Sequence, residues 1–155
     1  MDSQIKNIIA PAGIEISPGT IKMGTKYAKT LFVFSYPRYL STGWFSPIVN
    51  YPDLLDISIY VNPIDATYAL KQLRKKVTQV EAQLAERAEK GLIRDPILET
   101  AEQDIESLRD GLQQAQEALF AVGVYITFYG DSLEQLEKAE GKITNMLEGR
   151  MVYLK

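Results

Sequence analysis

The sequence predicts an α+β fold in which a small sheet carries a long helical hairpin. Segments rich in β-branched and aromatic residues, notably 27–36 and 122–129, indicate strands. Between residues 65 and 118, two stretches have apolar residues at alternating spacings of three and four. This spacing is typical of two helices that pair along a shared seam.

The N-terminal part predicts a lead and a short β-hairpin within residues 1–26. Residues 14–16 and 20–23 flank the turn Ser17-Pro18-Gly19. Proline presets φ and glycine permits positive φ, so this tripeptide reverses the chain between two strands.

A strand is expected over 27–36, and a short helix capped by Ser41 or Thr42 is expected to follow it. Pro47 and Pro52 should keep this helix short. The next strand, over 54–61, is expected to stop at Asn62-Pro63. Both strands belong to the core of the predicted sheet.

Two long helices follow. Asp65 is expected to cap the first, over 66–90, and Gly91 to end it. Asp95 and Pro96 start the second, which is expected to reach residue 118. The short connection makes the helices antiparallel neighbours, and basic residues prevail on the first and acidic ones on the second, which favours their pairing. The predicted seam consists of Leu70, Leu73, Val77, Val80 and Leu84 with Leu98, Ala101, Ile105, Leu108, Leu112, Ala115 and Leu119.

The remaining chain predicts a strand over 122–129, a helix over 132–148 that is capped by Asp131 or Ser132, and the start of a last strand at 151–154. Without the hairpin, the order is βαββαβ, which is the ferredoxin-like order. We therefore expect a ferredoxin-like core with an antiparallel coiled-coil hairpin inserted between its second and third strands. The chain stops inside its last strand, so we expect the native polypeptide to continue.

The predicted domains are the N-terminal lead and β-hairpin at 1–26, the α+β core at 27–64 and 119–155, and the hairpin insertion at 65–118. Large aromatic residues and exposed apolar residues fall in two of the loops that join these parts.

The composition excludes several kinds of chemistry. The chain has no Cys and no His, so thiolate nucleophiles, imidazole catalysis and the usual zinc sites are absent. The nearest string to a nucleotide-binding P-loop, Gly141-Lys142-Ile143-Thr144, lacks the motif's hydroxyl residue directly after lysine. We therefore expect a non-enzyme without cofactor or metal. With neither a signal peptide nor a spanning apolar run, a cytoplasmic location is expected.

Two segments are candidate partner-binding surfaces. Leu92, Ile93 and Arg94 lie at the expected tip of the hairpin, where exposed apolar residues suggest a contact. The second segment is an aromatic loop, which includes Arg38, Tyr39, Trp44 and Phe45. Such residues dominate binding hot spots, although the loop could equally pack over the open end of the core.

A basic cluster and a set of rings leave alternatives open. Lys71, Arg74, Lys75 and Lys76 either contact a phosphate or an acidic partner, or form a helix flank that faces acidic residues of the paired helix. Separately, single-stranded nucleic acid could stack on exposed rings of the sheet, for which Phe32, Phe34, Tyr125 and Phe128 are the candidates. A net charge of -3 argues against this second reading.

Several strings together resemble one family. They are IIAPAGIEISP, KYAKTLFVFSYPRYLSTGWFSPIVN, LDISIYVNPIDATYALKQLRKKVTQV, RDPILETAEQDIESLRD and YITFYGDSLEQLEK. They resemble the N-terminal region of the conjugation and type IV secretion ATPases, the CagE/TrbE/VirB group. The resemblance covers nearly the whole chain and rests on extended similarity instead of a catalytic signature.

The resemblance implies a domain that precedes a RecA-like motor and docks to other parts of a secretion channel at the inner membrane. The chain contains no Walker motif, so ATP hydrolysis would belong to the implied parent and no catalytic residue carries over. Expected partners are inner-membrane channel components, the parent's own motor and further copies of this chain, with membrane contact only through partners. The alternatives are a free-standing coiled-coil adaptor and a weak single-stranded nucleic-acid-binding domain.

Overall fold

The computed structural model describes residues 13–155 and divides them into two compact units. The sheet unit contains the residues up to Tyr60 together with Gly123–Lys155, and the hairpin unit contains Val61–Val122. The lead predicted for residues 1–12 lies outside the described residues.

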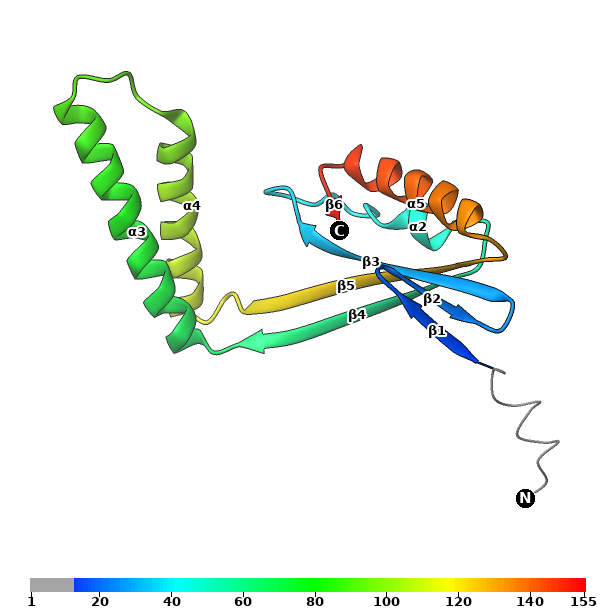
Figure 1. Cartoon of the computed structure of the whole chain (residues 1–155). Coiled ribbons are helices and arrows are strands. Elements are labelled where there is room, and N and C mark those ends of the chain that lie inside the picture. Colours follow the sequence, from blue (N-terminus) through cyan, green and yellow to red (C-terminus); the bar gives the residue numbers. More distant parts are fainter. Residues whose placement is uncertain (1–12) are drawn as a thin grey trace. The chain divides into compact units, whose positions relative to one another are not determined.

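A six-stranded sheet organises the sheet unit, with the order β1-β2-β3-β5-β4 and with β6 paired to β3 outside this path (Figure 1). Strands β1, β2, β3 and β5 run antiparallel to their neighbours, and so does β6 to β3. The strands are β1 (Ile14–Ser17), β2 (Thr20–Met23), β3 (Lys26–Ser35), β4 (Leu55–Ile64), β5 (Leu119–Gly130) and β6 (Tyr153–Leu154).

The pairing of β3 with β5 decides which side chains share a face. Leu31 lies opposite Ile126, and Phe32 lies opposite Tyr125. Because side chains alternate along a strand, the first pair points to one face of the sheet and the second pair to the other. Leu31 and Ile126 are buried, whereas Phe32 and Tyr125 are exposed.

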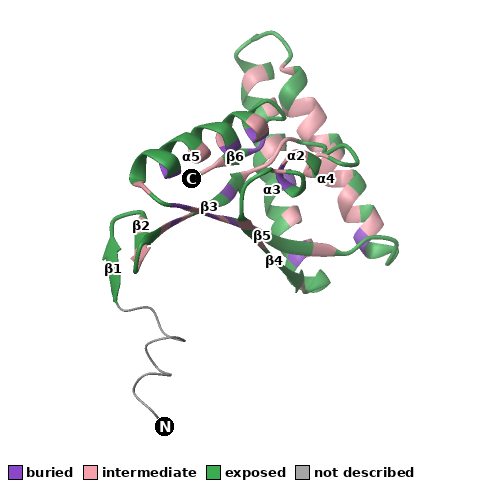
Figure 2. Ribbon diagram, turned by 90° about the vertical axis from the view of Figure 1, so that its right-hand side faces the viewer, coloured by how far each residue is buried: buried purple, intermediate pink, exposed green. Residues whose placement is uncertain are grey.

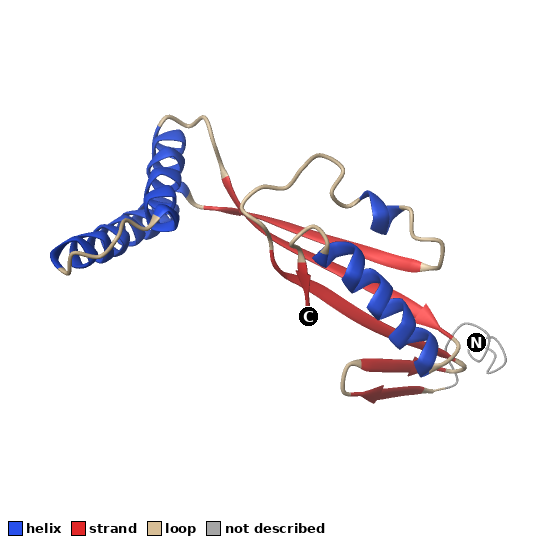
Figure 3. Cartoon of the chain, turned by 90° about the horizontal axis from the view of Figure 1, so that it is seen from above, coloured by secondary structure: helices blue, strands red, loops and turns tan. Residues whose placement is uncertain are grey.

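Helix α5 (Leu133–Glu148) lies across the face that carries Leu31 and Ile126 (Figures 1 and 3). Ser132 caps this helix by accepting a hydrogen bond from the backbone N–H of Gln135, which confirms one of the two predicted caps. Figure 2 shows the buried residues gathered along α5, β3 and β5. The core consists of Leu31, Val33, Ile48, Val124, Ile126, Phe128, Leu136, Ile143, Leu147 and Val152.

The predicted ferredoxin-like core is wrong, because the sheet has a different order and one of its helices is nearly missing. The last strand of that core should line the whole outer edge of β3. Instead, β2 pairs with the first part of that edge, and β6 adds only two residues at the far end. The N-terminal hairpin is therefore part of the sheet. Helix α2 (Ser46–Val49) is a single turn, with Phe45 at its N-cap in place of the predicted Ser41 or Thr42.

In the hairpin unit, α3 (Ala66–Glu89) packs against α4 (Pro96–Gln113). The predicted caps are confirmed: Asp65 accepts a hydrogen bond from the backbone N–H of Tyr68, and Asp95 accepts one from that of Ile97. These contacts satisfy amide groups that have no partner inside a first helical turn.

The predicted coiled-coil seam is wrong at its C-terminal end. Helix α4 ends at Gln113, and Ala115 takes a positive φ of 55°, so this residue reverses the chain before β5. Leu119 is the first residue of β5 and no part of a helix. Of the predicted seam, only Val77 and Leu112 are buried, so the two helices lack the continuous buried layers of a coiled coil.

The strand predicted over 54–61 extends further than expected. Strand β4 continues through Asn62 and Pro63 to Ile64. It is the last strand in the sheet order, so one of its edges has no neighbouring strand. Proline, which has no N–H to donate, is tolerated at such an edge.

Candidate functional site

The tip of the hairpin unit is a short, ordered connection. Gly91 has a φ of +62°, a conformation that favours glycine, and the backbone N–H of Leu92 donates to the carbonyl oxygen of Arg87 over 3.0 Å. The guanidinium of Arg87 donates in turn to the carbonyl oxygen of Ile93 and lies 3.8 Å from the Asp95 carboxylate. The backbone is thus held by contacts to α3 and to the start of α4.

This tip presents apolar side chains to solvent. Ile93 is 88% exposed, Ile97 is 80% exposed and Leu92 is 52% exposed. A groove of about 450 Å³ lies beside Leu92 and Ile93, and Arg94 and Glu99, which form an ion pair at 3.4 Å, both line it. Its lining residues include Leu84, Arg87, Ala88, Leu92, Ile93, Arg94, Asp95 and Glu99. The predicted tip residues Leu92, Ile93 and Arg94 therefore share one surface.

The aromatic loop of the sheet unit separates into two parts. The rings of Trp44 and Phe45 lie 4.9 Å apart, Trp44 meets Tyr36 edge-on, and all three pack against the core. Trp44 and Phe45 thus close the end of the core. By contrast, Tyr39 is 74% exposed, and the Arg38 guanidinium lies 5.0 Å from its ring centre. Only Arg38 and Tyr39 remain as a surface, in a different unit from the tip.

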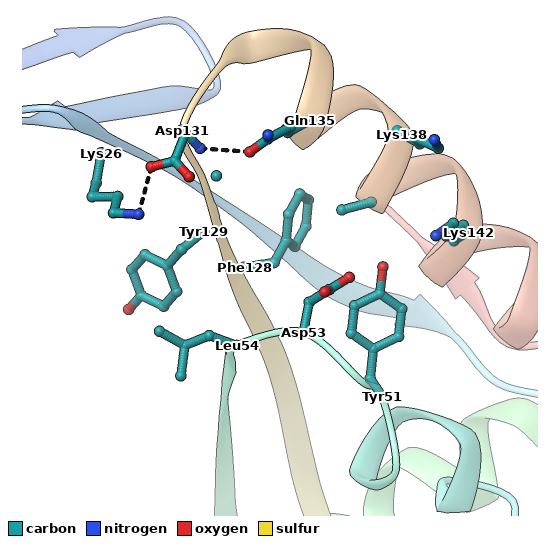
Figure 4. A pocket seen from close by; sticks show the side chains of 12 residues that line it. Lys26, Tyr51, Asp53, Leu54, Phe128, Tyr129, Asp131, Gln135, Lys138 and Lys142 are labelled. Atoms are coloured by element: carbon teal, nitrogen blue, oxygen red, sulfur yellow. Dashed lines mark hydrogen bonds and ion pairs between the residues drawn. The ribbon is translucent and has the colours of Figure 1, made fainter.

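A hollow of about 510 Å³ lies beside the start of α5 (Figure 4). The Asp131 carboxylate pairs with Lys26, and the Asp131 backbone N–H donates to the side-chain oxygen of Gln135 over 2.8 Å. Lys138 and Lys142, one helical turn apart, line the helix side, and buried Phe128 lines the sheet side.

The phenols near this hollow hold their protons. Desolvation and, to a smaller extent, the nearby Asp53 carboxylate raise the pKa of Tyr51. The pKa of Tyr129 is raised chiefly by the hydrogen bond that its hydroxyl donates to Asp56. A phenol with a raised pKa is a poor general base at neutral pH. Within residues 13–155, no group of three or more Asp or Glu residues could hold a metal ion.

The basic cluster on α3 is exposed at all four positions, Lys71, Arg74, Lys75 and Lys76. Both alternatives, a flank that faces acidic residues of α4 and a contact with a phosphate or an acidic partner, therefore stay predictions. The ion pair that does join α3 to the start of α4 is Arg87–Asp95.

Three of the four rings that the sequence offered for stacking lie on an exposed face of the sheet. Of the four ring candidates, Phe32, Phe34 and Tyr125 lie on the face opposite α5, whereas Phe128 is in the core. The signal was visible in the sequence, because strand 27–36 has large apolar residues at consecutive positions, where a half-exposed strand would alternate with polar ones.

No family model matches this chain, and no curated protein matches it. Among residues 13–155, no helix has the length and apolar character that a membrane span requires.

Proposed function

We propose that this chain is a non-catalytic docking domain that binds another protein through the tip of its helical hairpin. The observation that carries the proposal is the exposure of Leu92 and Ile93 on the ordered connection and of Ile97 in the first turn of α4. Large apolar side chains that are this exposed are costly to leave in water unless a partner covers them.

The order of the tip strengthens the proposal. The contacts of Arg87 with the Ile93 carbonyl oxygen and the Asp95 carboxylate fix the turn before any partner arrives. A surface that is ordered in advance loses less conformational entropy on binding. The neighbouring groove offers both apolar side chains, such as Leu92 and Ile93, and charged ones, such as Arg94, to a partner.

We further propose that the parent protein is a conjugation or type IV secretion ATPase. The support is the sequence resemblance stated above, and the expected partners are inner-membrane components of the secretion channel or the parent's motor. In this proposal the domain works at the cytoplasmic face of the membrane and reaches the membrane only through partners. Reading the native gene past the codon for Lys155 tests the parent, because a Walker motif should follow there.

The docking role is tested with Leu92→Ser combined with Ile93→Ser. This variant should fold normally, because both side chains are exposed, and should lose binding to channel components co-expressed from the same gene cluster. Glu89→Ser, an exposed polar change at the end of α3, is the matched control and should bind as before. Equal co-purification of all three proteins with the partner would refute the tip as a docking site.

A further inference from the structure

The groove at the hairpin tip lies within the hairpin unit, and α3, the connection at the tip and α4 all contribute to its lining. Its apolar lining residues are Leu84, Ala88, Leu92 and Ile93. Its charged lining residues are Arg87, Arg94, Asp95, Glu99 and Glu102. Apolar surface, two cations and three anions thus meet in one groove.

Four of these five charged residues pair with one another. The Arg87 guanidinium lies 3.8 Å from the Asp95 carboxylate, and that of Arg94 lies 3.4 Å from the Glu99 carboxylate. Glu102 is left over, about one helical turn further along α4 than Glu99. The lining therefore carries one negative charge that none of its own cations offsets.

Glu102 differs from the other acidic residues of the chain. Among residues 13–155, it is the one carboxylate that is half-buried and forms neither a hydrogen bond nor an ion pair. Acidic residues such as Glu81 and Glu89 also lack a partner within that range, but they are exposed. Glu102 gives up part of its hydration without a contact in return, which is unfavourable for a charged group. Neither of its oxygens is completely buried, so a cation from outside can still reach them.

We propose, on the basis of the docking role above, that the partner inserts a lysine or arginine side chain into this groove. The charged end of that side chain pairs with the Glu102 carboxylate through charge-assisted hydrogen bonds. Its aliphatic stem covers apolar surface, which Leu84 and Ala88 of α3 provide. One inserted side chain thereby matches both the apolar and the charged parts of the groove.

Charge excludes the other kinds of occupant. An acidic side chain or a phosphate would enter a lining that already carries three carboxylates, and like charges repel. A purely apolar side chain would cover Glu102 without pairing it, which is more unfavourable than leaving it half-buried. The net charge of -3 also favours the approach of a basic partner over longer distances.

A first measurement needs no partner. Glu102→Gln removes the charge and keeps the size and helix propensity of the side chain. Because Glu102 has no partner among residues 13–155, this variant should unfold in urea at the same concentration as the wild type or at a higher one. Glu81→Gln, at an exposed position of α3 without an ion pair in that range, is the matched control and should be neutral. A clear loss of stability in Glu102→Gln alone would reveal a contact inside the fold and overturn the inference.

A second measurement uses the channel component that co-purifies with the wild-type chain. Glu102→Gln should weaken its binding by about tenfold or more, and Glu102→Lys should abolish it, because the inserted cation loses its counter-charge. Glu81→Gln should bind like the wild type. Replacing the inserted lysine or arginine of the component with glutamate should restore binding to Glu102→Lys only. Added salt should weaken the wild-type complex more than that of Glu102→Gln.

The double variant Leu92→Ser with Ile93→Ser separates this inference from the docking role. If that variant loses binding while Glu102→Gln and Glu102→Lys bind fully, the tip docks a partner but no basic side chain occupies the groove. If the double variant binds fully, or if no channel component binds the wild type, the docking role fails and the inserted side chain fails with it.

Discussion

The hydroxyl of Tyr129 donates a hydrogen bond to the carboxylate of Asp56, and this contact ties β5 to the edge strand β4. Tyr60 lies four residues after Asp56 in β4, and Tyr125 lies four residues before Tyr129 in β5. The rings of Tyr60 and Tyr125 meet edge-on, so the two strands run antiparallel. Strand β4 has a neighbouring strand on one side only, so side-chain pairs such as Tyr129–Asp56 help to hold its register against β5.

Replacing Tyr129 with Phe should lower the free energy of unfolding by about 1 kcal/mol, because the Asp56 carboxylate loses its donor while the ring still packs. The hydrogen bond raises the pKa of Tyr129, so its contribution is complete below the ordinary tyrosine pKa and is lost as pH rises through the raised value. Urea unfolding at neutral and strongly alkaline pH should therefore show a smaller difference between variant and wild type at alkaline pH. A difference that grows with pH would contradict this account.

Leu136→Ala should destabilise the sheet unit by about 2–5 kcal/mol, because this side chain is 1% exposed in the core beneath α5. Leu133→Ala is the matched control on the same helix. Leu133 is 51% exposed, so its loss should change stability by less than about 1 kcal/mol. Thermal unfolding followed by near-ultraviolet circular dichroism compares them, and similar melting temperatures for the two variants would count against the assigned core.

Gly91→Ala and Gly141→Ala should change stability in opposite directions. A Cβ at either position meets nothing within 4 Å, so packing does not decide the result. Gly91 has a φ of +62°, where alanine is strained and should cost about 1 kcal/mol. Gly141 lies inside α5, where alanine should stabilise by about 0.5–1 kcal/mol. Urea unfolding measures both changes, and a stabilising Gly91→Ala would show that the connection between α3 and α4 is not closed as described.

Asp95→Ala should destabilise the hairpin unit by about 1 kcal/mol, because the Ile97 amide loses its acceptor and Arg87 loses an ion-pair partner. Gln113→Ala, an exposed position at the end of α4, is the control and should be nearly neutral. Hydrogen exchange of the first-turn amides of α4 gives a local readout. Unchanged protection of those amides in Asp95→Ala would show that the cap does not stabilise the helix.

Local signals in the sequence predicted the elements well. Asp65, Asp95 and Ser132 cap helices as expected, because each side chain needs only its own first turn to act. The ends that the sequence misplaced have two different causes, one in the sheet and one in the local backbone. Pro63 remains in a strand because β4 lies at the edge of the sheet, and α4 stops at Gln113 because Ala115 adopts a left-handed turn.

The sheet order could not be predicted from the order of elements along the chain. It depends on whether β2 or the last strand pairs with the outer edge of β3, and both are short strands of similar character. Of the candidate surfaces, the tip residues Leu92 and Ile93 are exposed, but Trp44 and Phe45 pack against the core. Aromatic residues in a loop can bind a partner or pack against the core, and only the packing in the structure distinguishes the two roles.

The pairing of Leu31 with Ile126 has a consequence for the order in which the polypeptide folds. These neighbours are far apart along the chain, so joining them first would require closing a very long loop, which slows folding. The α3–α4 hairpin forms from local contacts and draws the ends of that loop together. We therefore expect the backbone amides of α3 and α4 to become protected from hydrogen exchange early in refolding, and β3 and β5 to pair only afterwards.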